Sequence, residues 1–88
     1  ADAPPVSVIV CTRNGSATLR ACLESLSRLR YPTYEVLVID DGSTEPLAEL
    51  VKAFPQARYV RQEPAGLSVA RNRGMKEARG QILAYTDD

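Results

Sequence analysis

The sequence predicts an α/β fold whose parallel sheet is covered by helices on both faces. Two observations predict it. Short β-branched and aliphatic runs recur along the chain, and unbroken runs of this kind are typical of strands buried on both faces. Segments with apolar residues at helical spacing separate the runs, which gives the order β-α-β-α-β-α-β. Crossovers between parallel strands are right-handed, so the chain predicts one half of a doubly wound, Rossmann-like domain.

The central strands and the first helix have the strongest patterns. The two central strands are predicted by the near-continuous runs at residues 6–11 (VSVIVC) and 35–39 (EVLVI). Between them, leucines and one cysteine recur every three or four residues, which predicts a helix over about residues 17–29. Ser16 or Thr18 would be its N-cap, since a side-chain oxygen there can accept a backbone N–H of the first turn.

Weaker signals continue the same order after the second strand. Pro46 is tolerated in a first helical turn and Pro55 ends a helix, so a short helix is predicted between them. Residues 57–60 then predict a less apolar strand, which is expected at an edge of the sheet.

A third helix and a last strand complete the pattern. Residues 67–79 predict the helix, with Gly80 as its C-terminal cap, and residues 82–85 predict the strand. The helix residues expected to face the sheet are mostly small, which implies close packing: Leu67, Ala70, Gly74, Met75 and Ala78. A chain of this length buries enough surface for one modest core, so we expect residues 1–88 to form a single, partial domain.

Composition narrows the function. The chain has 11 Lys and Arg against 11 Asp and Glu, which argues against a nucleic-acid binder held by a basic surface. It has no histidine, so the commonest general base and zinc ligand is absent and carboxylate chemistry is favoured. Cys11 and Cys22 form no C-x-x-C pair and are expected in the core. No apolar run is long enough to span a bilayer and residues 1–5 do not resemble a signal peptide, so a soluble, cytoplasmic protein is expected.

Polar residues follow three of the four predicted strands. Residues 12–15 (TRNG) follow the first, residues 40–44 (DDGST) the second and residues 86–88 (TDD) the last. Ligands of open α/β sheets bind beyond the carboxyl ends of the strands, so we expect these segments to line one edge.

Two acidic pairs at that edge predict a cation. Asp40 with Asp41, and Asp87 with Asp88, would repel one another unless a positive charge lies between them. Magnesium and manganese accept one or two carboxylates together with phosphate oxygens and water, which suits a nucleoside diphosphate ligand. For residues 42–44 the favoured interpretation is instead a turn and helix cap.

The turn after the first strand is the other candidate contact. Asn14 and Gly15 form a strong turn dipeptide, and a nucleotide lying across it would meet Thr12 and the backbone. Arg13 could stack its guanidinium on a base or pair with a phosphate. Arg71 lies near the N-terminus of the third helix, where anions are favoured, and is also a candidate. The other basic residues there are expected to face solvent: Arg73, Lys76 and Arg79.

Four segments in this order resemble family 2 glycosyltransferases: VSVIVCTRN, EVLVIDDGST, GLSVARNRG and ILAYTDD. The resemblance covers residues 5–88 and is to the N-terminal, nucleotide-sugar-binding half of their GT-A fold. It implies a manganese or magnesium ion and a nucleotide sugar, most simply a UDP-sugar. It also implies transfer of the sugar, with inversion, to a sugar or lipid-linked acceptor.

The resemblance implies roles for individual residues. Asp41, with Asp40 beside it, would contact the uracil or ribose, and the strand-one turn would contact the nucleotide through Thr12, Arg13 and Asn14. Asp87 and Asp88 would hold the metal and the sugar diphosphate, while Arg71 and Asn72 match a further family motif.

The chain also departs from the family pattern. An aromatic residue is common where Arg13 stands, and proline where Cys11 stands. The family's general base follows the metal motif, so no catalytic base is expected within residues 1–88 and this chain alone should be inactive. The full protein could work at the cytoplasmic face of a membrane.

Two alternatives remain open at the level of sequence. One is a non-catalytic Rossmann-like module that binds a partner. The other is a different phosphate-handling enzyme, although the first strand ends in Thr-Arg-Asn rather than the acidic pair of a receiver domain, and no G-x-G-x-x-G opens the first helix. In each case an uncovered edge strand would favour self-association.

Overall fold

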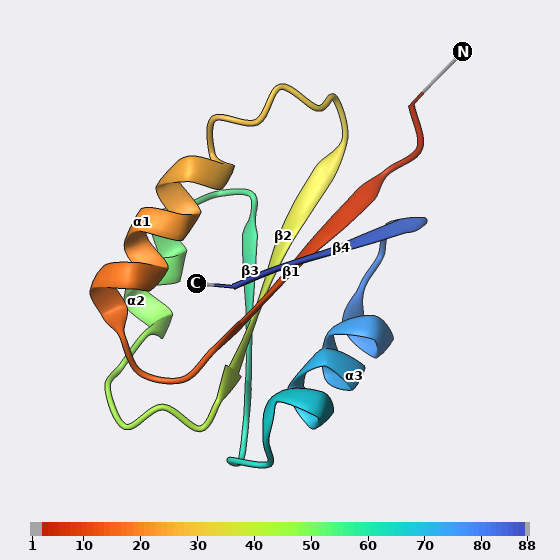
Figure 1. Cartoon of the computed structure of the whole chain (residues 1–88). Helices are drawn as coiled ribbons and strands as arrows, with labels where there is room; N and C mark the ends of the chain where they lie inside the picture. The colour runs from red at the N-terminus through yellow and green to blue at the C-terminus, as the bar shows by residue number, and fades with distance from the viewer. Residues whose placement is uncertain (1–2, 88) are drawn as a thin grey trace.

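A computed structural model describes residues 3–87, with Asp87 described in its backbone only, and it has the predicted α/β order (Figure 1). The elements are β1 (Val6–Thr12), α1 (Ser16–Leu26), β2 (Tyr34–Asp41), α2 (Ala48–Lys52), β3 (Ala57–Gln62), α3 (Leu67–Glu77) and β4 (Ile82–Asp87). The sheet order is β3-β2-β1-β4 and each neighbouring pair is parallel. Helices α1 and α2 cover one face, and α3 covers the other (Figure 1).

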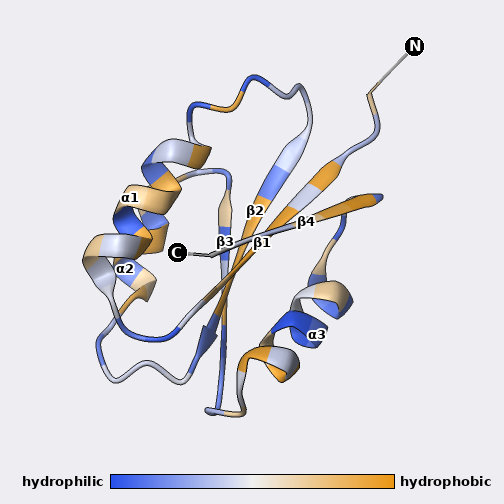
Figure 2. Cartoon of the chain, viewed as in Figure 1, coloured by the Kyte–Doolittle hydropathy of each residue, from blue (hydrophilic) through white to orange (hydrophobic). Residues whose placement is uncertain are grey.

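The near-continuous apolar runs of β1 and β2 supply two core layers, one on each face of the sheet. Alternate side chains of a strand point to opposite faces, so both faces can be apolar only in a continuous run. Figure 2 shows these strands as the hydrophobic centre of the molecule. The layer under α1 and α2 contains Val8, Val10, Leu19, Leu23, Val36, Val38, Leu47 and Val51. The layer under α3 contains Ile9, Leu37, Ile39 and Ala70.

Helix α3 packs closely on the sheet through small residues, as expected. A Cβ added at Gly74 would lie 2.5 Å from Cγ2 of Ile9, and Ala70 is fully buried. The prediction that Leu67 and Met75 also face the sheet is wrong, because they are 52% and 53% exposed. The helix lies so close that only residues about four apart reach the sheet, and Leu67 and Met75 lie off that narrow stripe.

Helix α1 ends earlier and begins differently than predicted. It stops at Leu26 rather than at residue 29, and Ser27, Arg28 and Leu29 continue as a hydrogen-bonded turn. Neither Ser16 nor Thr18 is its N-cap, because Gly15 occupies that position in a left-handed conformation. A distant residue takes over the capping role: Oε1 of Glu45 accepts the Ser16 N–H at 3.0 Å.

Gly80 does not cap α3 as predicted. The helix ends at Glu77 with Ala78 as its C-cap. Gly80 is instead required for close approach, because an added Cβ would lie 2.7 Å from the backbone nitrogen of Ser7. This contact brings the start of β4 against β1.

The two edges of the sheet are different. Strand β3 forms one edge, as its weaker pattern predicts, and α2 lies nearby. Strand β4 forms the other edge and leaves three large side chains exposed: Ile82, Leu83 and Tyr85. Cys11 and Cys22 are half-buried and each packs against one core layer. Within residues 3–87, none of the helices has the length and apolar character needed to cross a bilayer.

Candidate functional site

A cavity lies beyond the carboxyl ends of the central strands, at the end of the sheet where β1 and β2 finish. It has a volume of about 230 Å³ and is lined by Cys11, Thr12, Arg13, Asp41, Leu67 and Ala70. We call it the Asp41 cavity. In the sheet register Thr12 lies opposite Asp40 on one side, and Cys11 lies opposite the Asp87 backbone on the other. The structure therefore brings Thr12, Arg13 and Asp41 together where open α/β sheets bind ligands.

The Asp41 carboxylate is held rigidly in the wall of this cavity. The residue is 6% exposed, and its Oδ1 accepts hydrogen bonds from Nε2 of Gln62 at 2.9 Å and from the Ala65 N–H at 2.8 Å. Oδ2 accepts the Gly66 N–H at 3.0 Å. These bonds, led by that from Gln62 and joined by the positive charge of Arg13, lower the pKa of Asp41 although burial opposes them. The side chain is therefore a fixed, ionised acceptor.

Asp40 lies elsewhere although it is the next residue along the chain. It is 0% exposed, and its Oδ1 accepts the Ser43 N–H at 2.9 Å while its Oδ2 accepts the Tyr59 hydroxyl at 2.5 Å. The pKa of Tyr59 is raised to about 12, mainly by burial and in addition by this bond to Asp40. Asp40 does not line the Asp41 cavity, and its described contacts anchor the turn after β2. A nucleotide contact by Asp40 stays a prediction.

Asn14 joins the turns that follow β1 and β2. Its Oδ1 accepts hydrogen bonds from the Thr44 N–H at 2.9 Å, the Thr44 hydroxyl at 3.1 Å and the Glu45 N–H at 3.3 Å. Its backbone N–H donates to Oγ of Ser43 at 2.7 Å. Residues 42–44 are thus the turn that was expected, but they do not cap a helix, because the N-cap of α2 is Leu47.

Arg71 lies on a neighbouring surface rather than in the Asp41 cavity. Its guanidinium carbon is 5.9 Å from the centroid of the Tyr85 ring, a cation–π distance. Together they line a shallow hollow of about 430 Å³ with Ser68, Asn72 and Met75. Further along α3, Arg73 pairs with Glu77 at 3.1 Å. A nucleotide contact by Arg71 stays a prediction.

The predicted metal ligands fall at the end of what the structure describes. Asp88 lies outside the described residues and so does the side chain of Asp87, whose backbone ends β4 opposite Cys11. Up to residue 87, the described side chains include no cluster of three or more acidic or cysteine groups that could hold a metal by itself. Two carboxylates are a donor set of the kind that magnesium and manganese take when phosphate oxygens complete the shell, and a metal held by Asp87 and Asp88 stays a prediction.

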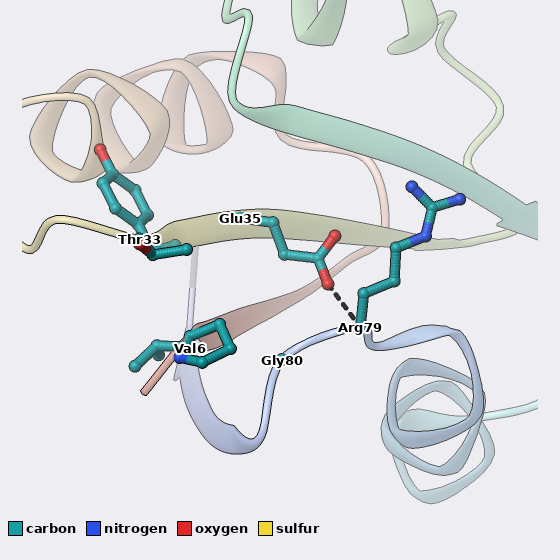
Figure 3. Close-up of a pocket in the computed structure, with 7 residues that line it drawn as sticks. Val6, Thr33, Glu35, Arg79 and Gly80 are labelled. Atoms are coloured by element: carbon teal, nitrogen blue, oxygen red, sulfur yellow. Dashed lines mark hydrogen bonds between the residues drawn. The ribbon is translucent and has the colours of Figure 1, made fainter. Parts of the chain in front are cut away.

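A second cavity lies at the amino ends of the strands, on the opposite edge (Figure 3). It has about 270 Å³ and includes Glu35, whose carboxylate accepts bonds from the Ser7 hydroxyl at 2.6 Å, the Arg79 N–H at 2.7 Å and the Arg58 guanidinium at 3.3 Å. Burial raises the pKa of Glu35, but these bonds outweigh it and the pKa lies below its usual range. The hydrogen bonds to this carboxylate all come from the protein itself, so its role here is structural: it joins β1, β3 and the segment after α3 to β2.

Sequence reasoning missed the donors that hold Asp41. They belong to Gln62, the last residue of β3, and to Ala65 and Gly66, which lead into α3. Two signals could have found them. The third predicted strand also ends at the carboxyl edge, and a glycine just before the third predicted helix indicates a backbone conformation that other residues rarely adopt, which Gly66 has with φ 103.

The model of the family described as "Glycosyl transferase family 2" matches residues 7–88. The uncharacterized glycosyltransferase YibD of Escherichia coli is 38% identical over 86 residues, which are 93% of this chain and 25% of that protein. The chain therefore spans about a quarter of the length of this curated relative.

Two solved structures have closely similar folds. The mannosyltransferase PcManGT from Pyrobaculum calidifontis, in complex with GDP-Man and Mn²⁺, aligns with a TM-score of 0.85 at 28% identity, covering 98% of this chain and 29% of that one. Staphylococcus aureus TarS 1-349, in complex with UDP-GlcNAc, aligns with a TM-score of 0.82 at 30% identity, covering 94% of this chain and 26% of that one.

Proposed function

Because the chain belongs to glycosyl transferase family 2, we propose that residues 1–88 form the donor-binding part of an enzyme that transfers a sugar from a nucleotide sugar to an acceptor. One observation carries the proposal. An ionised carboxylate, Asp41, is fixed in the wall of a cavity that also contains Thr12 and Arg13. A fixed anionic acceptor beside a cationic side chain can hold a base at one side and the phosphates at another.

Asp41 is suited to a base that presents one donor. A carboxylate offers about four acceptor positions, two on each oxygen. Gln62 and Ala65 occupy those of Oδ1, and Gly66 takes one on Oδ2, which leaves a single position on Oδ2 for a ligand. Uracil presents one imide N–H, whereas guanine presents two adjacent donors. This arrangement favours a UDP-sugar, and the charge-assisted bond would contribute about 1.5 to 3 kcal/mol.

Asp87 and Asp88 are proposed to hold a manganese or magnesium ion together with the sugar diphosphate. Support comes from the register, because the Asp87 backbone lies opposite Cys11, which lines the Asp41 cavity. When bound, such an ion neutralises the charge that develops on the leaving diphosphate. Arg13 is placed in the same cavity, where its guanidinium can pair with a phosphate oxygen.

The chemistry we propose is a single in-line displacement with inversion. The acceptor hydroxyl oxygen bonds to the anomeric carbon while the bond from that carbon to the diphosphate oxygen breaks. The hydroxyl proton passes to a carboxylate base, which we place in the protein beyond residues 1–88. The acceptor would be a sugar or a lipid-linked acceptor on the cytoplasmic side, and residues 1–88 alone would bind the donor without transferring its sugar.

Calorimetric titration of the intact protein with UDP, GDP and CDP in the presence of Mn²⁺ tests the donor site. UDP should bind more tightly than CDP, because the cytosine ring has an acceptor where uracil has its imide N–H. Asp41→Asn should weaken UDP binding by about 10- to 100-fold and reduce the preference over CDP. Glu63→Gln removes an exposed carboxylate from the loop before α3 and is the matched control. Equal UDP affinity in wild type and Asp41→Asn would contradict the site.

A further inference from the structure

We infer that Asn14 is a positioning residue that fastens the turn after β2 to the turn after β1 and so sets the width of the Asp41 cavity, without contacting the nucleotide itself. The inference rests on the proposed function, since it assigns this residue a part in donor binding. We call the contact among Asn14, Ser43, Thr44 and Glu45 the inter-turn contact.

The Asn14 side chain is engaged with the neighbouring turn. Its Oδ1 accepts three hydrogen bonds, from the N–H and hydroxyl of Thr44 at 2.9 and 3.1 Å and from the Glu45 N–H at 3.3 Å. These donors are 30 and 31 residues away in the sequence. A turn residue is usually explained by its backbone alone, and Asn14 does adopt φ 59. Glycine would satisfy that conformation equally well, so the backbone does not account for the amide oxygen and its three bonds.

The inter-turn contact continues into the buried part of the sheet. Ser43 is 4% exposed, and its Oγ accepts the Asn14 N–H while its own N–H donates to Asp40. Asp40 in turn accepts the hydroxyl of Tyr59 on β3. Nη2 of Arg61, also on β3, donates to the Ser43 carbonyl at 3.1 Å. The turn after β2 is therefore held by groups on β2 and β3 and by the turn after β1.

The position of this contact connects it to ligand binding. Arg13 lines the Asp41 cavity and directly precedes Asn14, while Asp41 lines it and lies two residues before Ser43. Asn14 does not line the cavity. Losing the amide oxygen removes three of the bonds between the two turns and leaves those from the Asn14 N–H to Ser43 and from the Ser16 N–H to Glu45. The turns are then held more loosely, and Arg13 can shift relative to Asp41. Binding then has to restore the spacing, and the cost appears as lower affinity.

Four single variants and one double variant of the intact protein test the inference, with the dissociation constant of UDP in the presence of Mn²⁺ as the readout. Asn14→Gly keeps the left-handed backbone and removes the acceptor, so UDP should bind about 10-fold more weakly. Asn14→Asp keeps an acceptor for all three donors and should recover most of that loss. Ser43→Ala and Asn14→Gly should not add when combined, because they break the same contact. Tyr34→Phe is the control, since it removes hydrogen bonds to Leu26 and Gln56 at the opposite edge.

Amide hydrogen exchange at Thr44 and Glu45 should accelerate in Asn14→Gly and stay slow in Asn14→Asp. Faster exchange with unchanged UDP affinity would overturn the inference, because the contact would then be structural only. Equal weakening in Asn14→Gly and Asn14→Asp would overturn it in favour of direct contact between the Asn14 amide nitrogen and the nucleotide. If the wild type binds neither UDP nor GDP, the proposed function fails before any variant is compared, and the inference falls with it.

Discussion

Asp41 and Gln62 are paired residues at the ends of two adjacent parallel strands, and the Gln62 side-chain amide donates to Oδ1 of Asp41 at 2.9 Å. The pairing ties the candidate ligand-binding carboxylate to the edge strand β3. It also explains why a residue at a strand end is so well fixed, since the same carboxylate accepts hydrogen bonds from the backbone N–H groups of Ala65 and Gly66, which lead into α3. The sheet and the helix both orient Asp41 before any ligand binds.

Gln62→Ala should raise the pKa of Asp41, because the bond from Gln62 is the largest of the effects that lower it. Nucleotide affinity should fall about 3- to 10-fold as the carboxylate becomes mobile. NMR titration of the Asp41 carboxyl carbon and UDP calorimetry measure the two effects. Gln56→Ala is the matched control at the opposite edge, where Gln56 accepts from Tyr34. An unmoved Asp41 titration would show that the bond to Gln62 does not matter.

Glu35→Gln should destabilise the fold by about 1 to 3 kcal/mol at neutral pH, because Ser7, Arg58 and the Arg79 N–H lose a charged acceptor. The folded pKa of Glu35 lies below its ordinary value of 4.5, so its contribution is present above pH 4.5 and is lost as the pH falls through the folded pKa. Urea unfolding of both proteins at several values between about pH 7 and about pH 3 checks this, because the stability difference should shrink toward the acid end of that range. A stability difference that stays constant down to the lowest pH would count against it.

Gly74→Ala should destabilise the protein even though alanine is the better helix former. The added Cβ would lie 2.5 Å from Cγ2 of Ile9, and overpacking of this kind costs about 1 to 3 kcal/mol against a gain of about 1 from helix propensity. Gly74→Val should be worse. Thermal unfolding measures both, and Lys76→Ala on the exposed side of α3 is the control. An increase in melting temperature for Gly74→Ala would mean that α3 can move away from the sheet.

Residues 1–88 should self-associate through the edge of β4, where Ile82, Leu83 and Tyr85 are exposed, because an edge strand can pair its backbone with a strand of another copy. Leu83→Lys should reduce the association, because a charged side chain on an edge strand discourages pairing with another copy. Light scattering over a range of concentrations measures the mass. Arg58→Lys on the opposite edge strand is a comparison that leaves β4 intact. A monomer mass at all concentrations would contradict the prediction.

Local patterns predicted the architecture because they reflect burial directly. Residues 6–11 and 35–39 are near-continuous β-branched and aliphatic runs, and such runs are typical of strands buried on both faces, so their central position could be read from the chain. The polar segments after them also lie at one edge, as parallel pairing requires. The ends of helices were less predictable. The first turn of α1 is capped by Glu45, a partner 29 residues away that no local pattern indicates.

Asp40 and Asp41 are a case that a local sequence pattern does not resolve. The strand pattern shows that two carboxylates end a central strand, and only the family resemblance singled out Asp41 as the one that would meet a ligand. Successive side chains of a strand point to opposite faces, so one of the two had to turn toward α2 and the other toward α3. Which carboxylate faces the cavity depends on how the strands and helices pack together. The crossovers place Tyr59 and the turn at Ser43 around Asp40, whereas the Asp41 cavity lies on the face covered by α3.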